Sequence, residues 1–177
     1  VRRLLRTAAT DVVGLSGTGA GEKDPGLLLG LGRLGGAPCV RLGQEGARIV
    51  VADRNPERGN ASVEKVKAVA PDAALALCDV AYEDQVEAAV KLAVERFGRL
   101  DVIVNNAGLM EFKPLAQLTS PDWNKVLAVD LVGAAQFIRF GFKAMANGGS
   151  FVNVASVHAV QTTPVVAPYA AAKAGML

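Results

Sequence analysis

Strand and helix signals alternate along this chain from about residue 43 onward, and no other feature limits the fold as strongly. Residues 48–53 form a short β-branched run that ends in Asp53, which is typical of a buried parallel strand. Three further strand-like runs lie at 73–80, 100–104 and 151–154. Apolar residues at helical spacing separate these runs. This rhythm predicts an α/β fold, in which a parallel sheet carries helices on both faces through right-handed crossovers.

Several helix boundaries are marked by residues that suit the ends of helices. The Asn-Pro pair at 55–56 opens the helix after the first run, because proline is tolerated at the first helical position. Gly98 is suited to end the next helix as a C-cap. Ser120 is expected to cap, and Pro121 to open, a long helix that runs to about Met145.

Length and composition exclude several classes of protein. The chain has 177 residues, which are enough for one globular domain and too few for two. Its composition, 51% hydrophobic and 20% charged, is that of a globular protein. With 19 basic and 17 acidic residues the net charge is +2, so no nucleic-acid partner is expected. Cys39 and Cys78 match neither a disulfide framework nor a metal site, and no apolar run is long enough to cross a bilayer. We expect a cytoplasmic protein without a membrane partner.

The most specific chemical signal is the pair Tyr169 and Lys173, which are four residues apart. This spacing places a phenol and an ammonium on one face of a helix. A phenol ionises only at about pH 10, but a neighbouring cation favours the phenolate and makes proton exchange with an alcohol feasible. Taken alone, the pair is more simply a chance surface pair.

Two polar features at strand ends accompany this pair. Ser156 lies thirteen positions before Tyr169, at the end of the strand-like run 149–156, where its hydroxyl can hold a carbonyl or alcohol oxygen. The Asn-Asn-Ala-Gly sequence at 105–108 directly follows another strand-like run. Its small and amide side chains allow a loop to approach a cofactor and to tie neighbouring strands together. Without these accompanying motifs, Ser156 would be interpreted only as a serine at the end of a strand.

Together these motifs resemble the classical short-chain dehydrogenase/reductase family. The resemblance rests on Asn-Asn-Ala-Gly at 105–108, the spacing from Ser156 to Tyr169, Tyr-x-x-x-Lys and Cys-Asp-Val at 78–80. It extends from about Gly35 to Leu177, and it implies a Rossmann-type doubly wound parallel sheet, incomplete here at both ends. It also implies an oxidoreductase that transfers a hydride between NAD(H) and a small secondary alcohol or carbonyl substrate. Extended-type epimerases and dehydratases share Tyr-x-x-x-Lys but are not expected to carry Asn-Asn-Ala-Gly.

The resemblance implies a role for each site residue. Tyr169 would be the general acid/base, Lys173 would favour its phenolate and bind the nicotinamide ribose, and Ser156 would orient the substrate oxygen. Further cofactor contacts would come from Asp79 and Val80 at the adenine and from Asn106 in the cleft. His158 is more simply a loop residue than a substrate contact.

Asp53 bears on the choice of cofactor. An acidic side chain at this strand end accepts hydrogen bonds from the adenosine ribose and repels a 2′-phosphate, which favours NAD over NADP. Arg54 is a complication, because an arginine accommodates that phosphate. Capping of the following helix is the alternative role of Asp53.

The first forty residues depart from the family pattern, which carries Thr-Gly-x-x-x-Gly-x-Gly after the first strand. The Leu-Leu-Leu run at 27–29 is the only candidate for that strand. The family spacing makes Gly35 the last glycine and a cofactor contact, but it places Arg33 where the pyrophosphate needs bare backbone. We therefore expect residues 1–40 to be an aberrant glycine-rich segment, a frame-shifted first βα unit. Residues 41–177 are then a partial nucleotide-binding domain.

A second departure is Asp130, where the family usually has a catalytic-site asparagine that bulges the long helix and holds a water in the proton relay. Aspartate keeps the size and the acceptor but loses the amide donor and adds a charge. We expect a weakened relay.

A third departure is the end of the chain at Leu177, where family members continue. The full-length family forms homo-oligomers, which are not expected of so short a chain. The alternatives to an active enzyme are a catalytically inactive nucleotide-binding remnant and a gene fragment.

Overall fold

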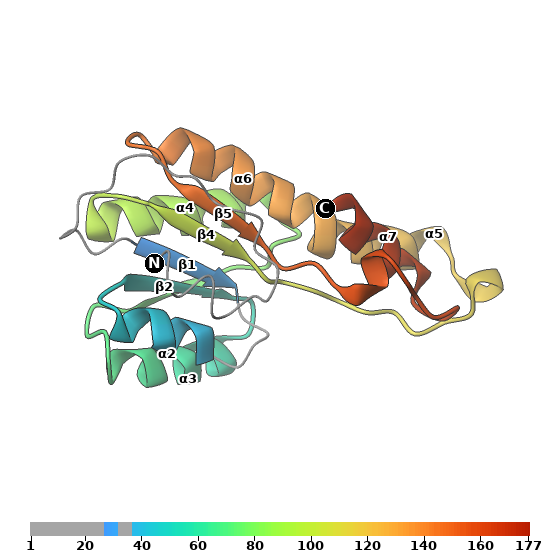
Figure 1. Ribbon diagram of the computed structural model, residues 1–177, viewed down its shortest axis with the longest axis horizontal. Helices are drawn as coiled ribbons and strands as arrows, with labels where there is room; N and C mark the ends of the chain where they lie inside the picture. The colour runs from blue at the N-terminus through green and yellow to red at the C-terminus, as the bar shows by residue number, and fades with distance from the viewer. Residues whose placement is uncertain (1–26, 32–36) are drawn as a thin grey trace.

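The computed structural model describes residues 27–31 and 37–177, which form a parallel sheet flanked by helices (Figure 1). Besides helices and strands it contains two short 3-10 turns, η1 and η3, and one π-helical turn, η2. In chain order the elements are β1 (Leu27–Leu31), α2 (Ala37–Gln44), β2 (Arg48–Asp53), α3 (Pro56–Lys67), β3 (Ala74–Leu77), α4 (Glu83–Phe97), β4 (Val102–Asn105), η1 (Leu115–Gln117), α5 (Ser120–Leu127), η2 (Ala128–Val132), α6 (Gly133–Ala144), β5 (Ser150–Asn153), η3 (Val157–Ala159) and α7 (Ala167–Gly175).

The strands of this part of the chain pair in the order β3-β2-β1-β4-β5, and every pairing is parallel. β1 lies at the centre, where Leu28 is opposite Ile49 of β2 on one side and Val102 of β4 on the other. The chain order reverses here, so the connections leave this point in opposite directions and open a crevice at the carboxyl ends of the strands. The predicted Rossmann-type α/β fold is confirmed.

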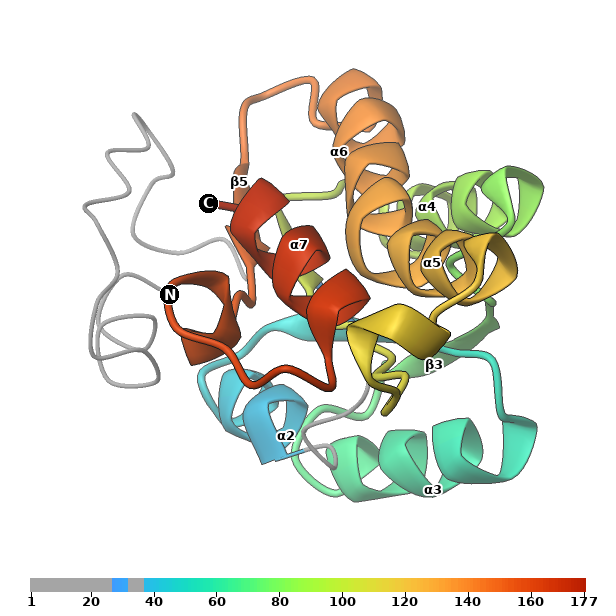
Figure 2. The ribbon, with the colours of Figure 1, turned by 90° about the vertical axis from the view of Figure 1, so that its right-hand side faces the viewer.

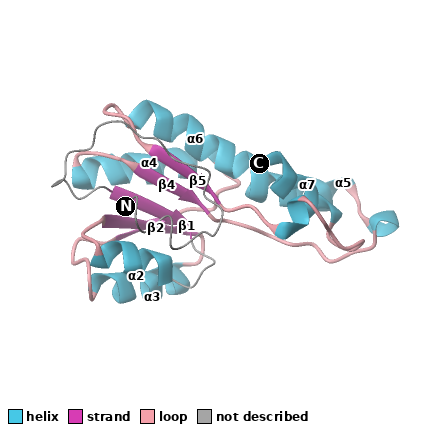
Figure 3. Ribbon diagram, in the orientation of Figure 1, coloured by secondary structure: helices cyan, strands magenta, loops and turns pink. Residues whose placement is uncertain are grey.

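Alternate side chains of β2 face two different layers of helices. Val50 and Ala52 are buried in the cluster that includes α4 and α6, whereas Ile49 and Val51 are buried in the cluster that includes α2 and α3. Figures 2 and 3 show these two pairs of helices on opposite faces of the sheet. A strand covered on both faces needs apolar residues at successive positions, which is why this segment is continuously hydrophobic.

Two predicted helix ends are confirmed. Asn55 caps α3, because its Oδ1 accepts a hydrogen bond from the backbone N of Arg58 at 2.8 Å. Gly98 ends α4 with a φ of 75°, in the left-handed region that favours glycine.

The long helix predicted for residues 120–145 is present, but it changes from α-helix to π-helix and back to α-helix along its length. The π-helical turn η2 separates α5 from α6, and its extra residue turns the side chain of Asp130 into the protein. The helix cap is Thr119 rather than the predicted Ser120. Thr119 Oγ1 accepts from the backbone N of Asp122, and the Asp122 carboxylate accepts from the backbone N of Thr119.

The strand predicted for residues 73–80 is shorter than expected. The backbone N of Cys78 makes a last hydrogen bond to the Asp53 carbonyl at 3.0 Å, beyond the end of β3. The backbone N of Asp79 then donates to Gln85 Oε1 of α4 at 2.8 Å, which turns the chain away from the sheet. Cys78, Asp79 and Val80 therefore lie at the carboxyl edge rather than inside the sheet.

The predicted first strand at 27–29 is confirmed as part of β1, and α2 begins at Ala37. The predicted cofactor contact Gly35 and the departure Arg33 lie outside the described residues, and the division at residue 40 stays a prediction. Within 27–31 and 37–177, no helix combines the length and the apolar character that a membrane crossing requires.

Gly133 begins α6 directly against the loop that follows β3. A Cβ at this position would lie 2.8 Å from the Val80 carbonyl oxygen and 2.9 Å from its Cγ2. Backbone cannot move aside as a flexible side chain can, so we expect Gly133→Ala to lower the free energy of unfolding by about 1–3 kcal/mol. Chemical denaturation beside Ala135→Ser, an exposed position of the same helix, measures the effect, and equal stability of the two variants would contradict it.

Candidate active site

A cavity of about 180 Å³ opens at the carboxyl ends of β2, β3 and β4. Ligands of open α/β sheets bind in this kind of crevice. Three residues predicted to contact the cofactor, Asp53, Asp79 and Val80, lie around it. The lining residues are Ala52, Asp53, Arg54, Arg58, Cys78, Asp79, Val80, Ala107, Gly108, Leu109 and Val129.

Asp53 is buried at the end of β2 and is held by an arginine that the sequence analysis did not single out. Arg58 Nε donates to Asp53 Oδ2 at 2.7 Å, and Arg58 Nη2 donates to Asp53 Oδ1 at 2.5 Å. This bidentate hydrogen bond raises the pKa of Arg58. Oδ1 also accepts from the backbone N of Asn55, the residue that caps α3. Arg58 lies five residues after Asp53, across the turn into α3. Ion pairs within a helix are recognised by a spacing of three or four residues, so the sequence does not signal this pair.

Arg54 and Asp79 form a second ion pair at the cavity, 3.5 Å apart. Asp79 Oδ1 also accepts from the backbone N of Ala81, which holds the carboxylate at the edge of the sheet. Burial, with smaller contributions from Asp79 and Asp84, raises the pKa of the neighbouring Cys78 thiol to about 12. That thiol therefore stays protonated and acts as an apolar wall of the cavity.

Lys173 is buried in α7 and is surrounded by acceptors. Its Nζ donates to the carbonyl oxygens of Val154 at 3.1 Å and Ala107 at 3.5 Å, and it lies 3.8 Å from Asp130 Oδ2. Burial lowers the pKa of Lys173, and the nearby Asp130 acts in the opposite direction. The ammonium is 5.7 Å from the centroid of the Tyr169 ring. The predicted side-by-side placement of Tyr169 and Lys173 is therefore present.

Gly108 is the point at which the predicted catalytic side chains meet the cavity. A Cβ on this glycine would lie 3.4 Å from Asp130 Oδ2 and 3.9 Å from both Lys173 Nζ and Tyr169 Cε2. Because Gly108 also lines the cavity, the Tyr169–Lys173 pair lies next to a residue of the cavity wall.

His158 approaches Tyr169 from η3, which packs against α7, and Ser156 caps the start of that turn. Ser156 Oγ accepts from the backbone N of His158 at 3.2 Å. The His158 ring meets the Tyr169 ring edge to face at 5.8 Å, and its Nδ1 is 3.1 Å from Thr162 Oγ1. His158, expected to be a simple loop residue, is therefore a neighbour of the proposed acid/base.

The Asn-Asn-Ala-Gly sequence begins with a buried asparagine. Asn105 Nδ2 donates to Asn153 Oδ1 at 2.9 Å and so ties β4 to β5, as predicted. Asn106, the predicted cofactor contact, is half-buried next to the cavity but does not line it. No group of three His, Cys, Asp or Glu side chains is placed to hold a metal ion within 27–31 and 37–177.

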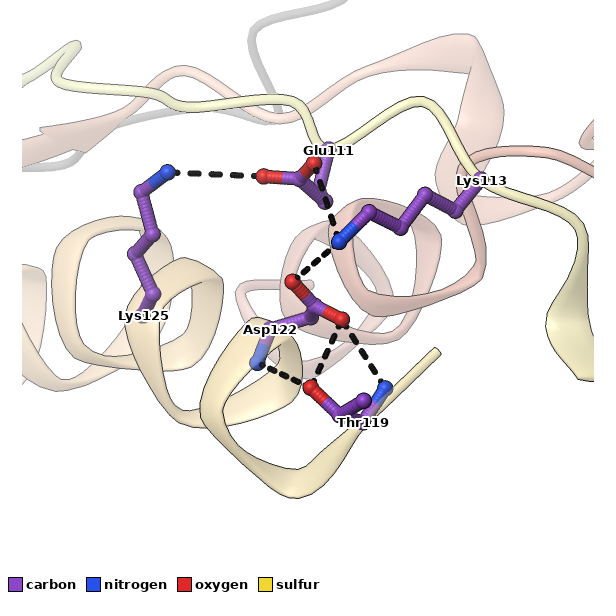
Figure 4. A network of polar contacts seen from close by, with 5 residues as sticks. All are labelled: Glu111, Lys113, Thr119, Asp122 and Lys125. Carbon is purple, nitrogen blue, oxygen red and sulfur yellow. Dashed lines mark hydrogen bonds and ion pairs between the residues drawn. The ribbon is translucent and has the colours of Figure 1, made fainter. Parts of the chain in front are cut away.

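A network of charged side chains holds the loop after β4 against α5 (Figure 4). Lys113 Nζ donates to Asp122 Oδ1 at 2.7 Å, and the other carboxylate oxygen of Asp122 accepts from Thr119. Glu111 bridges the Lys113 and Lys125 ammonium groups at 3.7 and 3.4 Å. The backbone N of Lys113 also donates to the Val165 carbonyl, so the same loop supports the segment that leads into α7.

Comparison with known proteins agrees with this geometry. The model of the short chain dehydrogenase family matches residues 28–177. The short chain dehydrogenase/reductase AstE of Aspergillus oryzae is 35% identical over 164 residues, which cover 90% of this chain and 59% of that protein. NAD+-bound xylitol dehydrogenase has a TM-score of 0.81 at 30% identity and covers 85% of this chain and 60% of its own. A metagenomic short-chain oxidoreductase in complex with NADP has a TM-score of 0.79 at 30% identity, with 85% and 71% covered.

The doubly wound sheet and the crevice at its switch point define a Rossmann-type domain. The chain belongs to the short-chain dehydrogenase/reductase family of oxidoreductases. Its family match begins at residue 28, ahead of the residue 35 expected from the motifs. The chain spans 53–61% of the length of the curated relatives that it matches.

The charged network around Asp122 has a measurable pH dependence. Lys113 and the Thr119 cap hold the pKa of Asp122 well below its usual range. A carboxylate whose pKa is lowered by folding stabilises the protein above its unfolded pKa of about 4, and this contribution is lost as the pH falls below that value. We expect Asp122→Asn to lower the melting temperature at neutral pH, and the difference from the parent chain to shrink on acidification. Asp72→Asn, on an exposed loop, is the matched control; a difference that does not change with pH would contradict the assignment.

Proposed function

We propose that this chain carries the catalytic core of an NAD(H)-dependent oxidoreductase that interconverts a small secondary alcohol and the corresponding carbonyl compound. The observation that carries the proposal is the proximity of Tyr169 and Lys173 to Gly108, the glycine that also lines the cavity. A phenol and an ammonium are thereby placed next to a crevice of the kind that holds dinucleotides. Neither group would be needed there for packing alone.

The residues around the cavity suit a dinucleotide. The absence of a side chain at Gly108 leaves backbone open to the ligand, and Asp53, Asp79 and Val80 line the same cavity. These three side chains would hold the adenosine half, and Tyr169 and Lys173 would contact the nicotinamide ribose. Asn106 and Gly35 complete the proposed set of cofactor contacts.

Each catalytic side chain has a separate task in this proposal. A bound nicotinamide accepts or supplies the hydride. Tyr169 removes the hydroxyl proton when the alcohol is oxidised and returns a proton to the oxygen when the carbonyl is reduced. Ser156 donates a hydrogen bond to the same substrate oxygen and so fixes it beside the phenol. Lys173 favours the phenolate through its charge, and Asp130 acts on Tyr169 through Lys173.

We propose NAD rather than NADP as the cofactor. Asp53 presents a buried carboxylate at the end of β2, where the adenosine ribose of a bound dinucleotide lies. Arg58 and Arg54 are both engaged, with Asp53 and Asp79 respectively, so that neither guanidinium is offered to a 2′-phosphate without breaking an ion pair. Related structures include complexes with NAD and a complex with NADP, so the proposal rests on these ion pairs.

Replacement of Tyr169 tests the proposed chemistry. Tyr169→Phe removes the proton donor but keeps the ring that packs on His158, so we expect turnover of secondary alcohols with NAD to fall about 100- to 10,000-fold. Binding of NADH, followed by its fluorescence, should be nearly unchanged. Tyr82→Phe, at the chain's other tyrosine, is the control. Equal turnover by the two variants would exclude Tyr169 as the acid/base, and cofactor binding without turnover in the parent chain would favour a nucleotide-binding role.

Replacement of Asp53 tests the cofactor choice. Asp53→Ser removes the charge that repels a 2′-phosphate and releases Arg58 to meet it. We expect the ratio of kcat/KM for NAD to that for NADP to fall by about tenfold or more. Asp101→Asn, a carboxylate paired with Arg99 at the amino end of β4, is the control. A ratio that the Asp53 change leaves unaltered would show that another residue selects the cofactor.

A further inference from the structure

Two opposite charges are buried side by side next to Tyr169. Asp130 in η2 is 1% exposed and Lys173 in α7 is 2% exposed, and Asp130 Oδ2 lies 3.8 Å from Lys173 Nζ. Figure 2 shows α7 beside α5, at the end of the helical layer where η2 links α5 to α6. A charge withdrawn from water to this extent needs a partner, because its desolvation is otherwise strongly unfavourable.

Asp130 is the charged partner of Lys173 among the groups that surround the ammonium. The other neighbours are the carbonyl oxygens of Val154 and Ala107 and the sulfur of Met176, at 3.1, 3.5 and 3.4 Å, and none of them brings a net charge. Burial lowers the pKa of Lys173, and Asp130 raises it again. The carboxylate therefore stabilises the protonated lysine.

The two oxygens of Asp130 have different partners. Oδ1 accepts from the backbone N of Leu109 at 2.7 Å, which fixes the loop that lines the cavity. An amide oxygen at this position would accept the same hydrogen bond. Oδ2 faces Lys173 and Gly108. The negative charge is thus separable from the structural contact, and Asp130→Asn removes the charge alone.

We propose that Asp130 is the counter-ion of Lys173, and that its carboxylate sets the pH range in which Tyr169 exchanges a proton by offsetting the attraction of the ammonium for the phenolate. The inference rests on the proposed function, in which Tyr169 is the general acid/base. The geometry brings the three groups together, because Lys173 Nζ is 5.7 Å from the centroid of the Tyr169 ring and Asp130 Oδ2 and Tyr169 Cε2 both flank Gly108. Asp130 is a positioning residue here, since it acts through the lysine.

Other charges near Tyr169 do not replace this pair. In the described part of the chain, the ionisable side chains that face Tyr169 are Lys173 on its own helix, Asp130 of η2 and His158 of η3. α5 also packs on α7. Its charged side chains, together with those of the preceding loop, pair with one another in the network of Figure 4: Glu111, Lys113, Asp122 and Lys125.

The test follows the ionisation of tyrosine directly, without cofactor or substrate. The chain has two tyrosines, so labelling with ¹³C at Cζ yields two NMR signals, which Tyr82→Phe assigns. Tyr82 is 57% exposed at the start of α4 and serves as the internal reference. Spectra are recorded from about pH 7 to about pH 11 for the parent chain and for Asp130→Asn.

In Asp130→Asn no carboxylate offsets the ammonium, and the Tyr169 phenolate takes its place as the charged partner of Lys173. We expect the Tyr169 transition to move to lower pH by on the order of 1–2 pH units, while the Tyr82 transition stays in place. The rising limb of alcohol oxidation against pH should move in the same direction. A Tyr169 transition that stays in place or moves to higher pH overturns the proposal. A shift in the NMR titration without turnover in either chain supports the ion pair and instead refutes the proposed function.

Two further variants keep the test decisive. Asp101→Asn removes a carboxylate paired with Arg99 at the opposite end of β4, and it should leave the Tyr169 transition unchanged. If circular dichroism shows that Asp130→Asn does not fold, Asp130→Ser supplies a neutral acceptor for Leu109 in its place. The same downward shift is expected of Asp130→Ser, and its absence overturns the proposal.

Discussion

Parallel pairing of the strands is the constraint on which the rest of this molecule depends. Parallel neighbours cannot be joined by tight turns, so each connection crosses the sheet through a helix and every strand ends at the same edge. This is why side chains distant in the sequence gather at one place: Asp53 follows β2, Asp79 follows β3, Gly108 follows β4 and Ser156 follows β5. The candidate site is therefore a consequence of topology, and helix α7 completes it by bringing a phenol and an ammonium to that edge.

Charge pairing is the second organising feature, and its energetic weight varies with burial. The side chains of Arg54 and Arg58 are more than half exposed, so both guanidinium groups can rearrange when a ligand enters the cavity, although the carboxylate of Asp53 is buried. The pair of Asp130 and Lys173 is withdrawn from water, where each charge acts strongly on its neighbours. In the proposed function, the two arginine pairs bear on the choice of cofactor, and the pair of Asp130 and Lys173 bears on proton exchange.

Much of this arrangement could be predicted from local patterns, and the failures share one cause. The β-branched run of β2, the cap at Asn55 and the left-handed glycine Gly98 are local signals, and the structure has each of them. The early end of β3 and the pairing of Asp53 with Arg58 were not predicted, and a bulge of the long helix at position 130 was implied only by the family resemblance. In each case the outcome depends on hydrogen bonds or packing to groups that no periodicity identifies, such as the Gln85 side chain or the loop that contains Leu109.

By itself, the sequence determined the fold class and the order of strands and helices, because hydrophobic periodicity is a local property of the chain. The Tyr-x-x-x-Lys spacing likewise identified the residues that we propose for proton exchange. Only the tertiary structure decided what surrounds those residues. It placed His158 against Tyr169, supplied Arg58 to Asp53 and set Asp130 against Lys173. The physical reason is that desolvation and charge pairing depend on distances in space, and a chain folded through parallel crossovers brings together groups that its sequence keeps far apart.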